Sequence, residues 1–438
     1  MNLNKLKSLY LNSPLIFKEI YALIPFKFRN GKTYRVWRER LKHQTADDRN
    51  PSATLKYAVS NFKMYKDLYN SIDIDNWEKI PFIDKYFIQK HISEFELFSI
   101  PKFYVTTGGV TGKPAKFFQS NNIWYKELAF VYDYFEKHGY KSNMIKATFR
   151  GGDFSVLKQN IFWKSNPNYN EIHFSPFHIN SKTIEYYIEK LNKTKPKYFH
   201  GYPSALISLA KLMNNNGLML NYKLKCIFII SEGFKKEDVE FLKSSFNCDV
   251  SSFYGHSERL IFAEANKDLD CYIPNPLYGY MELIDENGNV IKNNNVVGEL
   301  VATSYDNLAM PLIRYKTGDY THYVDYTKKS FAPLKGKWGQ MNLIGFNGEE
   351  ISLSALNLHS NELNSIQKLQ FVQTQKGKVI LNVMFENQNN NLLIKSISEL
   401  LTNRVGRLIQ FDLNETEDFI LNSRGKMPLI IDQTINHQ

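Results

Sequence analysis

The chain has 438 residues, of which 43% are hydrophobic, 14% aromatic and 23% charged. This length exceeds what one hydrophobic core usually organises, so we expect two or three domains, and the composition excludes an intrinsically disordered protein. No run approaches the roughly 20 apolar residues of a membrane helix, and no secretory signal opens the chain. The cysteines Cys226, Cys248 and Cys271 follow no disulfide or metal-ligand spacing. We therefore predict a globular cytoplasmic protein.

The net charge of +11 is concentrated in a basic head, residues 1–42. Before Gln44 the sequence has ten Lys and Arg residues against two Glu residues, a net of +8, so the remainder is nearly balanced. This localisation argues against nucleic-acid binding. The basic residues alternate with aliphatic and aromatic ones, a pattern typical of peripheral contact with the inner face of a membrane. The favoured alternative is a docked helix with a solvated basic face, because apolar residues at helical spacing usually pack on their own protein.

From Thr54 to about Phe95 the apolar spacing predicts helices, with an extended break at Ile80-Pro81-Phe82. Between Ile100 and Gly345 short strands alternate with helical stretches, which predicts an α/β sheet architecture. The clearest of these elements are strands at 103–106, 224–230, 278–284 and 298–302 and helices at 181–191 and 204–214.

The C-terminal part of the chain reads as a smaller α+β lobe. Its predicted elements are a hairpin around Lys376-Gly377, a helix over 391–403 and a strand over 408–413. We expect this lobe to be separate from the main body.

The segment from Val105 to Pro114, VTTGGVTGKP, follows a predicted strand and combines three glycines, three threonines and one lysine. The glycines allow the backbone to approach an anion, the hydroxyls donate hydrogen bonds, and the lysine supplies charge. The loop therefore predicts a phosphate site. Its spacing matches neither a Walker A loop nor a dinucleotide fingerprint, and taken alone it is equally compatible with a plain hairpin turn.

Three more motifs follow this loop in order: Tyr254-Gly255-His256-Ser257-Glu258, Arg314-Tyr315-Lys316-Thr317-Gly318-Asp319 and Ser423-Arg424-Gly425-Lys426. Together they resemble the adenylate-forming superfamily, and most closely its phenylacetate-CoA ligase-like branch, which includes CapK-like proteins of capsular polysaccharide biosynthesis. The resemblance covers roughly residues 61–431. Four further sequence segments support the assignment to this branch: His200-Gly201-Tyr202-Pro203-Ser204, Ser231-Glu232-Gly233, Ile80-Pro81-Phe82 with Lys85, and Phe346-Asn347-Gly348-Glu349-Glu350-Ile351-Ser352.

The resemblance implies an α/β fold with a large N-terminal adenylate-forming domain, whose mixed sheets are flanked by helices, and a small mobile C-terminal α+β lobe. The regions are 1–95, the basic head and a helical region of the large domain; 96–338, its ATP- and substrate-binding core; and 339–438, the lobe with the catalytic lysine. The implied activity is that of an acid–thiol ligase. It would activate a small carboxylic acid with ATP and Mg²⁺, form AMP, and transfer the acyl group to CoA or to the phosphopantetheine of an acyl carrier protein in surface polysaccharide biosynthesis.

The resemblance also implies roles for individual residues. Glu258 would hold Mg²⁺ and act in catalysis, Tyr254 would stack on adenine, and Asp319 would accept hydrogen bonds from the ribose hydroxyls. Lys426 would bridge the substrate carboxylate and the α-phosphate in the adenylation transition state. The remaining expected nucleotide contacts are Thr106, Thr107, Gly108, Gly109, Thr111, Lys113, Gly255, Ser257, Arg314 and Lys337.

Lys337 stands where the hinge motif of the superfamily usually has arginine, and no aspartate follows it. Lysine cannot reproduce the bidentate contact of arginine, which bears on whether the lobe moves between the two half-reactions. A second reading is therefore a non-catalytic protein of this fold that binds a nucleotide or a partner in a polysaccharide assembly complex.

The substrate pocket is expected to have an apolar or aromatic lining, which leaves the acid unidentified. The candidates are His200, Tyr202, Phe228, Phe253 and His256. His256 beside Ser257 and Glu258 is not a hydrolase triad, because consecutive residues cannot supply that geometry.

Overall fold

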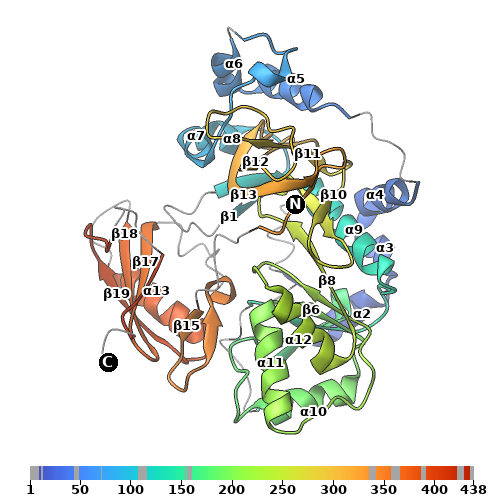
Figure 1. The fold of residues 1–438 in the computed structure, drawn as a ribbon, viewed down its shortest axis with the longest axis vertical. Helices are drawn as coiled ribbons and strands as arrows, with labels where there is room; N and C mark the ends of the chain where they lie inside the picture. The colour runs from blue at the N-terminus through green and yellow to red at the C-terminus, as the bar shows by residue number, and fades with distance from the viewer. Residues whose placement is uncertain are drawn as a thin grey trace.

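The computed structural model describes residues 9–10, 13–43, 49–70, 72–106, 116–152, 154, 160–334, 342–356, 366–385, 391–421 and 429–434. Within these ranges the chain forms a large α/β body and a smaller C-terminal lobe, which is drawn in orange to red in Figure 1. The α/β architecture predicted from the sequence is confirmed. The boundaries that we predict for the three regions stay predictions.

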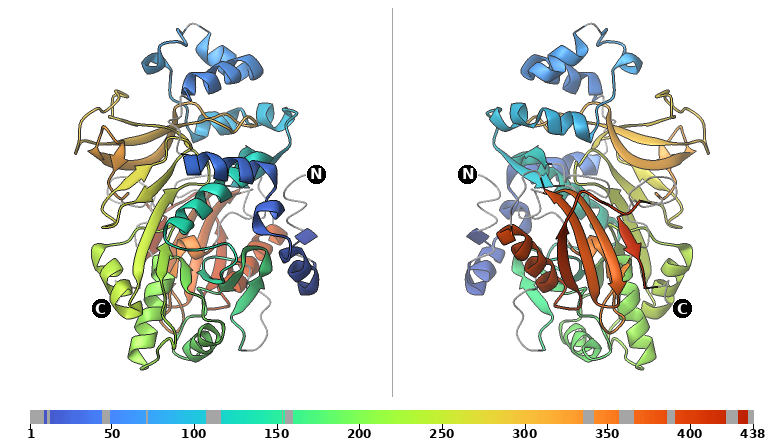
Figure 2. Two further views of the ribbon diagram at one scale, coloured as in Figure 1. Left: turned by 90° about the vertical axis from the view of Figure 1, so that its right-hand side faces the viewer. Right: turned by 90° about the vertical axis from the view of Figure 1, so that its left-hand side faces the viewer.

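The basic head contains α2 (Leu15–Ala22), α3 (Phe26–Arg29) and α4 (Gly31–His43). α4 packs on α9 (Asn121–Lys137), because the residues that it buries, Tyr34, Trp37 and Leu41, recur at helical spacing. In contrast, α2 buries no residue, and Figure 2 shows the dark blue N-terminal helices at the outer edge of the molecule. The docked arrangement favoured from the sequence is therefore confirmed for α4, whereas α2 lies against η2 (Pro167–Tyr169) without burying any of its residues.

The helices predicted between Thr54 and Phe95 are present, with the extended break at Ile80-Pro81-Phe82 between η1 and α7. Asn50 and Asp84 cap the first turns of α5 and α7 by accepting hydrogen bonds from the amides of Ser52 and Phe87. The elements are α5 (Pro51–Asn61), α6 (Lys63–Tyr69), η1 (Trp77–Lys79), α7 (Lys85–Lys90) and α8 (Ile92–Leu97).

A sheet of 12 strands crosses the described part of the body in the order β11-β12-β13-β14-β10-β9-β8-β7-β6-β3-β5-β4. The strands are β3 (Lys146–Phe149), β4 (Trp163–Asn166), β5 (Glu171–Phe174), β6 (Tyr198–Gly201), β7 (Cys226–Ile229), β8 (Asp249–Gly255), β9 (Phe262–Ala265), β10 (Tyr272–Pro274), β11 (Gly279–Ile284), β12 (Val297–Ser304), β13 (Tyr315–Asp325) and β14 (Ser330–Phe331). A separate hairpin pairs β1 (Lys102–Thr106) with β2 (Lys116–Ser120), and η2 (Pro167–Tyr169) links β4 to β5.

The strands β5, β3, β6, β7 and β8 are parallel, and helices cover both of their faces. α9 packs on one face, whereas α10 (Ile184–Thr194), α11 (Pro203–Asn215) and α12 (Lys236–Phe246) pack on the other. Strand β3 approaches β6 so closely that a Cβ on Gly201 would lie 2.4 Å from the carbonyl oxygen of Phe149. Glycine at this position therefore allows the carboxyl ends of the parallel strands to stay in register.

The C-terminal lobe confirms the predicted hairpin, helix and strand. It contains a four-stranded sheet in the order β19-β18-β17-β20, with α13 packed on it through Leu401 and Phe411. Gly377 forms the hairpin turn with a φ of 75°, where a Cβ would strike the Phe346 ring at 2.1 Å. The elements are β15 (Asn342–Ile344), β16 (Glu350–Ser352), η3 (Leu353–Leu356), β17 (Ile366–Gln375), β18 (Lys378–Phe385), α13 (Asn391–Arg404), β19 (Gln410–Glu415) and β20 (Ile430–Asp432).

Among the described helices, none combines the length and the apolar character that crossing a bilayer requires.

Candidate functional site

The segments that follow β6, β7 and β8 meet at one edge of the sheet, because the carboxyl ends of these strands are in register. Tyr202 follows β6, Ser231 follows the end of β7, and the motif from Tyr254 to Glu258 spans the end of β8. Ser231 has a φ of 66°, a left-handed conformation that is uncommon for a residue with a side chain and often marks functional sites. Ligands of open α/β sheets bind at such an edge. This edge is therefore the candidate site.

Two predicted nucleotide ligands, Tyr254 and Asp319, contact one another. The hydroxyl of Tyr254 donates a hydrogen bond to Oδ2 of Asp319 at 2.8 Å, although the two residues lie on β8 and β13. Burial, together with the Asp319 carboxylate, raises the pKa of Tyr254 well above its ordinary value. The phenol therefore stays protonated and orients the carboxylate.

The turn before Asp319 is held by its neighbouring strand. Gly318, with a φ of 70°, donates its amide hydrogen to Oε1 of Glu299 at 3.0 Å. The Thr317 hydroxyl donates to the carbonyl oxygen of Leu300 at 2.7 Å and accepts from the amide of Asp319 at 3.1 Å. These bonds fix the position of the carboxylate by tying its backbone to β12.

Glu258, the predicted Mg²⁺ ligand, lies between the side chains of Tyr315 and His256. The hydroxyl of Tyr315 donates to Oε1 at 3.4 Å, and Nδ1 of His256 lies 3.1 Å from Oε2. Burial and the Glu258 carboxylate raise the pKa of Tyr315, so its hydroxyl remains a donor. A single hard carboxylate suits Mg²⁺ that is bound mainly through phosphate oxygens and water. Within the described ranges, no cluster of three or more His, Cys, Asp or Glu residues could hold a metal by itself.

Arg314 requires a correction, because its side chain is only 1% exposed and faces the core. Its guanidinium forms a bidentate pair with Glu282, at 3.1 and 2.9 Å, and donates to the carbonyl oxygen of Ile80 at 2.6 Å. The guanidinium also lies 4.1 Å from the centroid of the Phe82 ring. Arg314 therefore holds the Ile80–Phe82 segment against the sheet, a link between two motifs that sequence spacing does not reveal.

Thr106 is the one predicted phosphate-loop ligand within the described ranges, where it ends β1 opposite Lys116 of β2. Gln119 on β2 donates a hydrogen bond to the carbonyl oxygen of Ser257 at 2.6 Å, which ties this hairpin to the motif after Gly255. The other predictions for this site, Thr107, Gly108, Gly109, Thr111, Lys113, Lys337 and Lys426, lie outside the described residues.

The predicted substrate pocket also needs correction. Phe228 is fully buried, with its ring stacked on Phe135 of α9 at a centroid distance of 4.4 Å, so it belongs to the core. His200 lies under the same helix, and neither ring nitrogen has a hydrogen-bond partner among the described residues. Burial holds the pKa of His200 well below its ordinary value, so the ring is neutral. Both side chains point to the face that α9 covers, whereas the sequence pattern treats all five candidates alike.

The other pocket candidates lie nearer the carboxyl edge. Tyr202 is largely buried directly after β6, and Phe253 on β8 is half-buried against the ring of Tyr134 at 5.3 Å. His256 is held beside Glu258, and its Nε2 has no partner among the described residues. These three positions remain candidates for contact with the acid.

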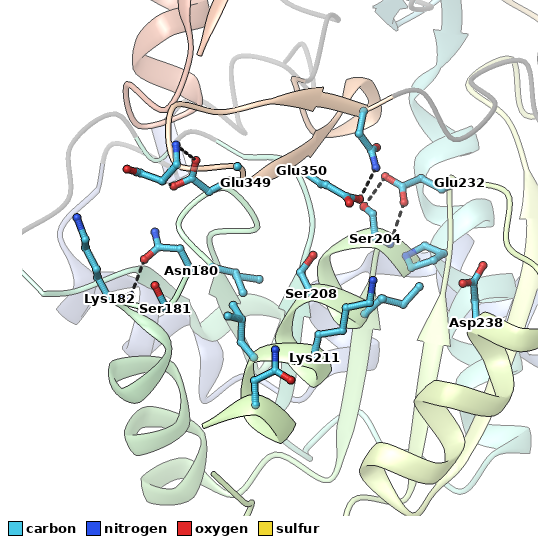
Figure 3. Close-up of a pocket in the computed structure, with 18 of the residues that line it drawn as sticks. Asn180, Ser181, Lys182, Ser204, Ser208, Lys211, Glu232, Asp238, Glu349 and Glu350 are labelled. Atoms are coloured by element: carbon cyan, nitrogen blue, oxygen red, sulfur yellow. Dashed lines mark hydrogen bonds between the residues drawn. The ribbon is translucent and has the colours of Figure 1, made fainter. Parts of the chain in front are cut away.

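Sequence reasoning missed a pocket of about 660 Å³ between the large body and the lobe (Figure 3). α11, α12 and the segment before α10 form one wall, and the β15–β16 hairpin forms the other. The charged lining residues are Lys182, Lys211, Lys235, Glu232, Asp238, Glu349 and Glu350. Because segments far apart in the chain supply this lining, no single motif predicts it.

One contact in this pocket had a sequence signal. The two oxygens of Glu232 accept hydrogen bonds from the amide and the hydroxyl of Ser204, each at 3.1 Å, at the first turn of α11. A carboxylate here caps the amide groups and complements the helix dipole. A serine that opens a helix and a glutamate that follows the next strand are the signal that would predict this contact.

A family model and a known protein both match this chain. Residues 343–433 match the family model of the CapK C-terminal domain. The chain is 26% identical over 434 residues to Protein CapK of Staphylococcus aureus, covering 93% of this chain and 94% of that protein.

Among solved structures, the chain resembles 2-hydroxyisobutyryl-CoA ligase in two states, at 16% identity. The complex with 2-HIB-AMP and CoA in the thioesterification state has a TM-score of 0.53, covering 88% of both chains. The postadenylation complex with R3-HIB-AMP has a TM-score of 0.50, covering 87% of this chain and 88% of that one. The resemblance drawn from the ordered motifs is confirmed: residues 343–433 match the CapK C-terminal domain, the chain as a whole is similar to Protein CapK, and its fold is that of 2-hydroxyisobutyryl-CoA ligase.

Proposed function

We propose that the protein activates a small carboxylic acid with ATP and transfers the acyl group to a thiol. The observation that carries the proposal is the hydrogen-bonded pair of Tyr254 and Asp319 beside Glu258 at the carboxyl edge of the sheet. An aromatic ring, a fixed acceptor and a carboxylate suit the base, the ribose and the metal of Mg-ATP. The relation to CapK and the CoA-ligase fold support the same chemistry.

In the first step, a carboxylate oxygen of the acid attacks the α-phosphorus of ATP. The bond from this phosphorus to the β-phosphate oxygen breaks, pyrophosphate leaves, and an acyl-adenylate forms. Tyr254 and Asp319 would orient the nucleoside, and the loop that begins at Thr106 would hold the departing phosphates. Lys426 would neutralise charge between the two reacting anions. Mg²⁺, when bound by Glu258, would neutralise charge on the phosphates.

In the second step, a thiolate attacks the acyl carbon, the bond to the AMP oxygen breaks, and a thioester forms. We propose CoA or the phosphopantetheine arm of a carrier protein as the acceptor. The pocket of about 660 Å³ supports a route for this acceptor, because it opens beside Glu232 at the same edge of the sheet. Lys182, Lys211 and Lys235 supply the cations that a phosphate-bearing arm requires.

We also propose that the thioester serves surface polysaccharide biosynthesis, in the cytoplasm at the inner face of the membrane. The relation to CapK supports the pathway, and the net charge of +8 before Gln44 supports the location. The proposed adenylation step does not depend on either the pathway or the location.

Carboxylate-dependent exchange of labelled pyrophosphate into ATP tests the first step, with a panel of small acids as substrates. We expect exchange with the wild-type chain and on the order of 10- to 100-fold weaker ATP use in Asp319→Ala, the cost of hydrogen bonds to a charged group. Asp325→Ala, at the other end of the same strand β13, is the matched control and should exchange normally. Nucleotide binding without exchange for any acid would favour the non-catalytic alternative.

The two half-reactions separate the role of Lys426 from that of Glu258. We expect Lys426→Ala to abolish adenylate formation and to leave transfer from a preformed acyl-adenylate largely intact, since the lysine serves the first step. Glu258→Gln should mainly raise the Mg-ATP concentration that exchange requires. Equal loss of both half-reactions in Lys426→Ala would contradict its assignment.

A further inference from the structure

The helix α2 and the segment after it leave large apolar side chains about half exposed or more among the described residues. α2 is an eight-residue helix with no buried residue. The exposed fractions of the apolar patch range from 44% to 82%. The patch consists of Leu15, Ile16, Phe17, Ile20, Leu23, Ile24 and Phe28. Large exposed apolar side chains that gather within one short segment of a folded protein indicate an interaction site.

Cations surround these apolar residues. Between Ser13 and Val36 the sequence contains Glu19 as its only acidic residue, against the basic residues Lys18, Lys27, Arg29, Lys32 and Arg35. Lys27 and Arg35 both lie over the ring of Phe28, at 5.2 and 5.4 Å from its centroid. Apolar and cationic groups are therefore presented together rather than on opposite sides of the molecule.

The rest of the head explains why the patch stays in place. α4 is anchored on α9 by Trp37 and by the ion pair of Arg38 with Asp133 at 2.9 Å. On the other side, the hydroxyl of Tyr10 accepts a hydrogen bond from the amide of Asn168 at 3.2 Å, and Arg29 donates to the Asn168 side chain at 3.3 Å. The residues on both sides of the patch are therefore held to the large body by these contacts.

We propose that the apolar patch and its cations form a docking surface for an anionic lipid bilayer. Apolar side chains would enter the boundary between headgroups and acyl chains, while the cations would contact lipid phosphates. A second copy of the chain fits less well, because two patches brought face to face would oppose their like charges. The inference does not depend on the proposed ligase activity.

Co-sedimentation of the full chain with vesicles tests the proposal, using phosphatidylcholine with or without phosphatidylglycerol at low and high salt. We expect binding only to the anionic vesicles, and weaker binding at high salt. The charge variant Lys27→Glu, Lys32→Glu, Arg35→Glu should bind on the order of 100-fold more weakly at low salt. Its control is Lys193→Glu, Lys197→Glu, Lys223→Glu, which reverses three exposed cations elsewhere and should bind far more strongly than the patch variant.

The apolar variant Phe17→Ser, Ile20→Ser, Leu23→Ser should lose about tenfold or more of its binding, because less apolar surface would enter the bilayer. Leu97→Ser with Met219→Ser removes exposed apolar groups elsewhere and should bind normally. The proposal is overturned if the wild-type chain does not bind anionic vesicles. It is also overturned if both patch variants bind them as strongly as the wild type does. Self-association that the apolar variant abolishes would assign the patch to a second copy, and a large fall in its melting temperature would assign it to the protein's own interior. Either result also overturns the proposal.

Discussion

The helices α2 and α4 are close in the sequence and similar in composition, yet they differ in how much of their surface the fold buries. Both mix basic residues with aliphatic and aromatic ones, but α4 buries Tyr34, Trp37 and Leu41 against α9, whereas α2 buries nothing. The difference lies in the partner surface. α9 offers the Phe130 ring and paired carboxylates at the spacing of α4, and no described element offers the same to α2. An amphipathic pattern therefore identifies a surface that needs covering but not what covers it.

The largest effect should come from Trp37→Ala. Trp37 is 6% exposed and packs against the ring of Phe130 at 5.5 Å, so its removal should lower the free energy of unfolding by about 3–5 kcal/mol. The adjacent Val36 is 41% exposed, and Val36→Ala should change that free energy by no more than about 0.5 kcal/mol. Urea denaturation of both variants measures the contrast, and similar losses would show that α4 is not docked as described.

Lys126 lies beneath α4, where it donates a hydrogen bond to the carbonyl oxygen of Tyr278 at 2.6 Å and pairs with Asp306. Burial lowers the pKa of Lys126 to about 8, below the 10.5 of an unburied lysine. Above pH 8 the folded state has released a proton that the unfolded chain still binds, so stability should rise with pH until the unfolded lysine also titrates.

Above pH 8 the free energy of unfolding of the wild type should rise by about 1.4 kcal/mol per pH unit relative to that of Lys126→Met. Denaturation of both proteins at several pH values measures it, because the titration of other groups cancels in the difference. A difference that stays flat with pH would mean that Lys126 keeps its charge through its pairing with Asp306.

Arg38 should contribute less than Trp37. Its guanidinium pairs with Asp133 at 2.9 Å and with Glu136, and Arg38→Met would leave the half-buried Asp133 carboxylate without this partner, at a cost of about 1–3 kcal/mol. Arg35→Met, on the exposed side of α4, is the control and should change unfolding by about 0.5 kcal/mol or less. Equal values for the two arginines would contradict the docked geometry.

The smallest effect belongs to α2. Leu23→Ser, at the C-cap of α2, replaces a side chain that is 82% exposed and should leave the free energy of unfolding within about 0.5 kcal/mol of wild type. A larger loss in thermal unfolding would show that α2 packs on part of its own chain, which would remove its contrast with α4.

Local patterns predicted much of the secondary structure and the order of the functional motifs. The hairpin around Gly377, the helix that begins at Asn391 and the short strands of the sheet follow from apolar period and turn residues, which act over a few positions. The motif order likewise predicted that Tyr254, Glu258 and Asp319 belong to one site, and the structure places Tyr254 and Asp319 in contact. These features depend on signals between residues that are close in the sequence, so the sequence alone is enough to detect them.

Only the tertiary structure decided which of these residues face the site. The run from Cys226 to Ile229 is apolar on both faces, so its period does not distinguish Phe228, covered by α9, from Ile227, covered by the helices opposite. The motif that contains Arg314 suggested a nucleotide contact, but the side chain of Arg314 instead pairs with Glu282, 32 residues away in the chain on β11. The pocket beside Glu232 and the difference in burial between α2 and α4 also depend on tertiary structure. In both cases segments far apart in the sequence supply the surfaces that bury or leave exposed a side chain. The sequence by itself determined the elements and the chemistry available at the site, and long-range packing determined which side chains remain there to use it.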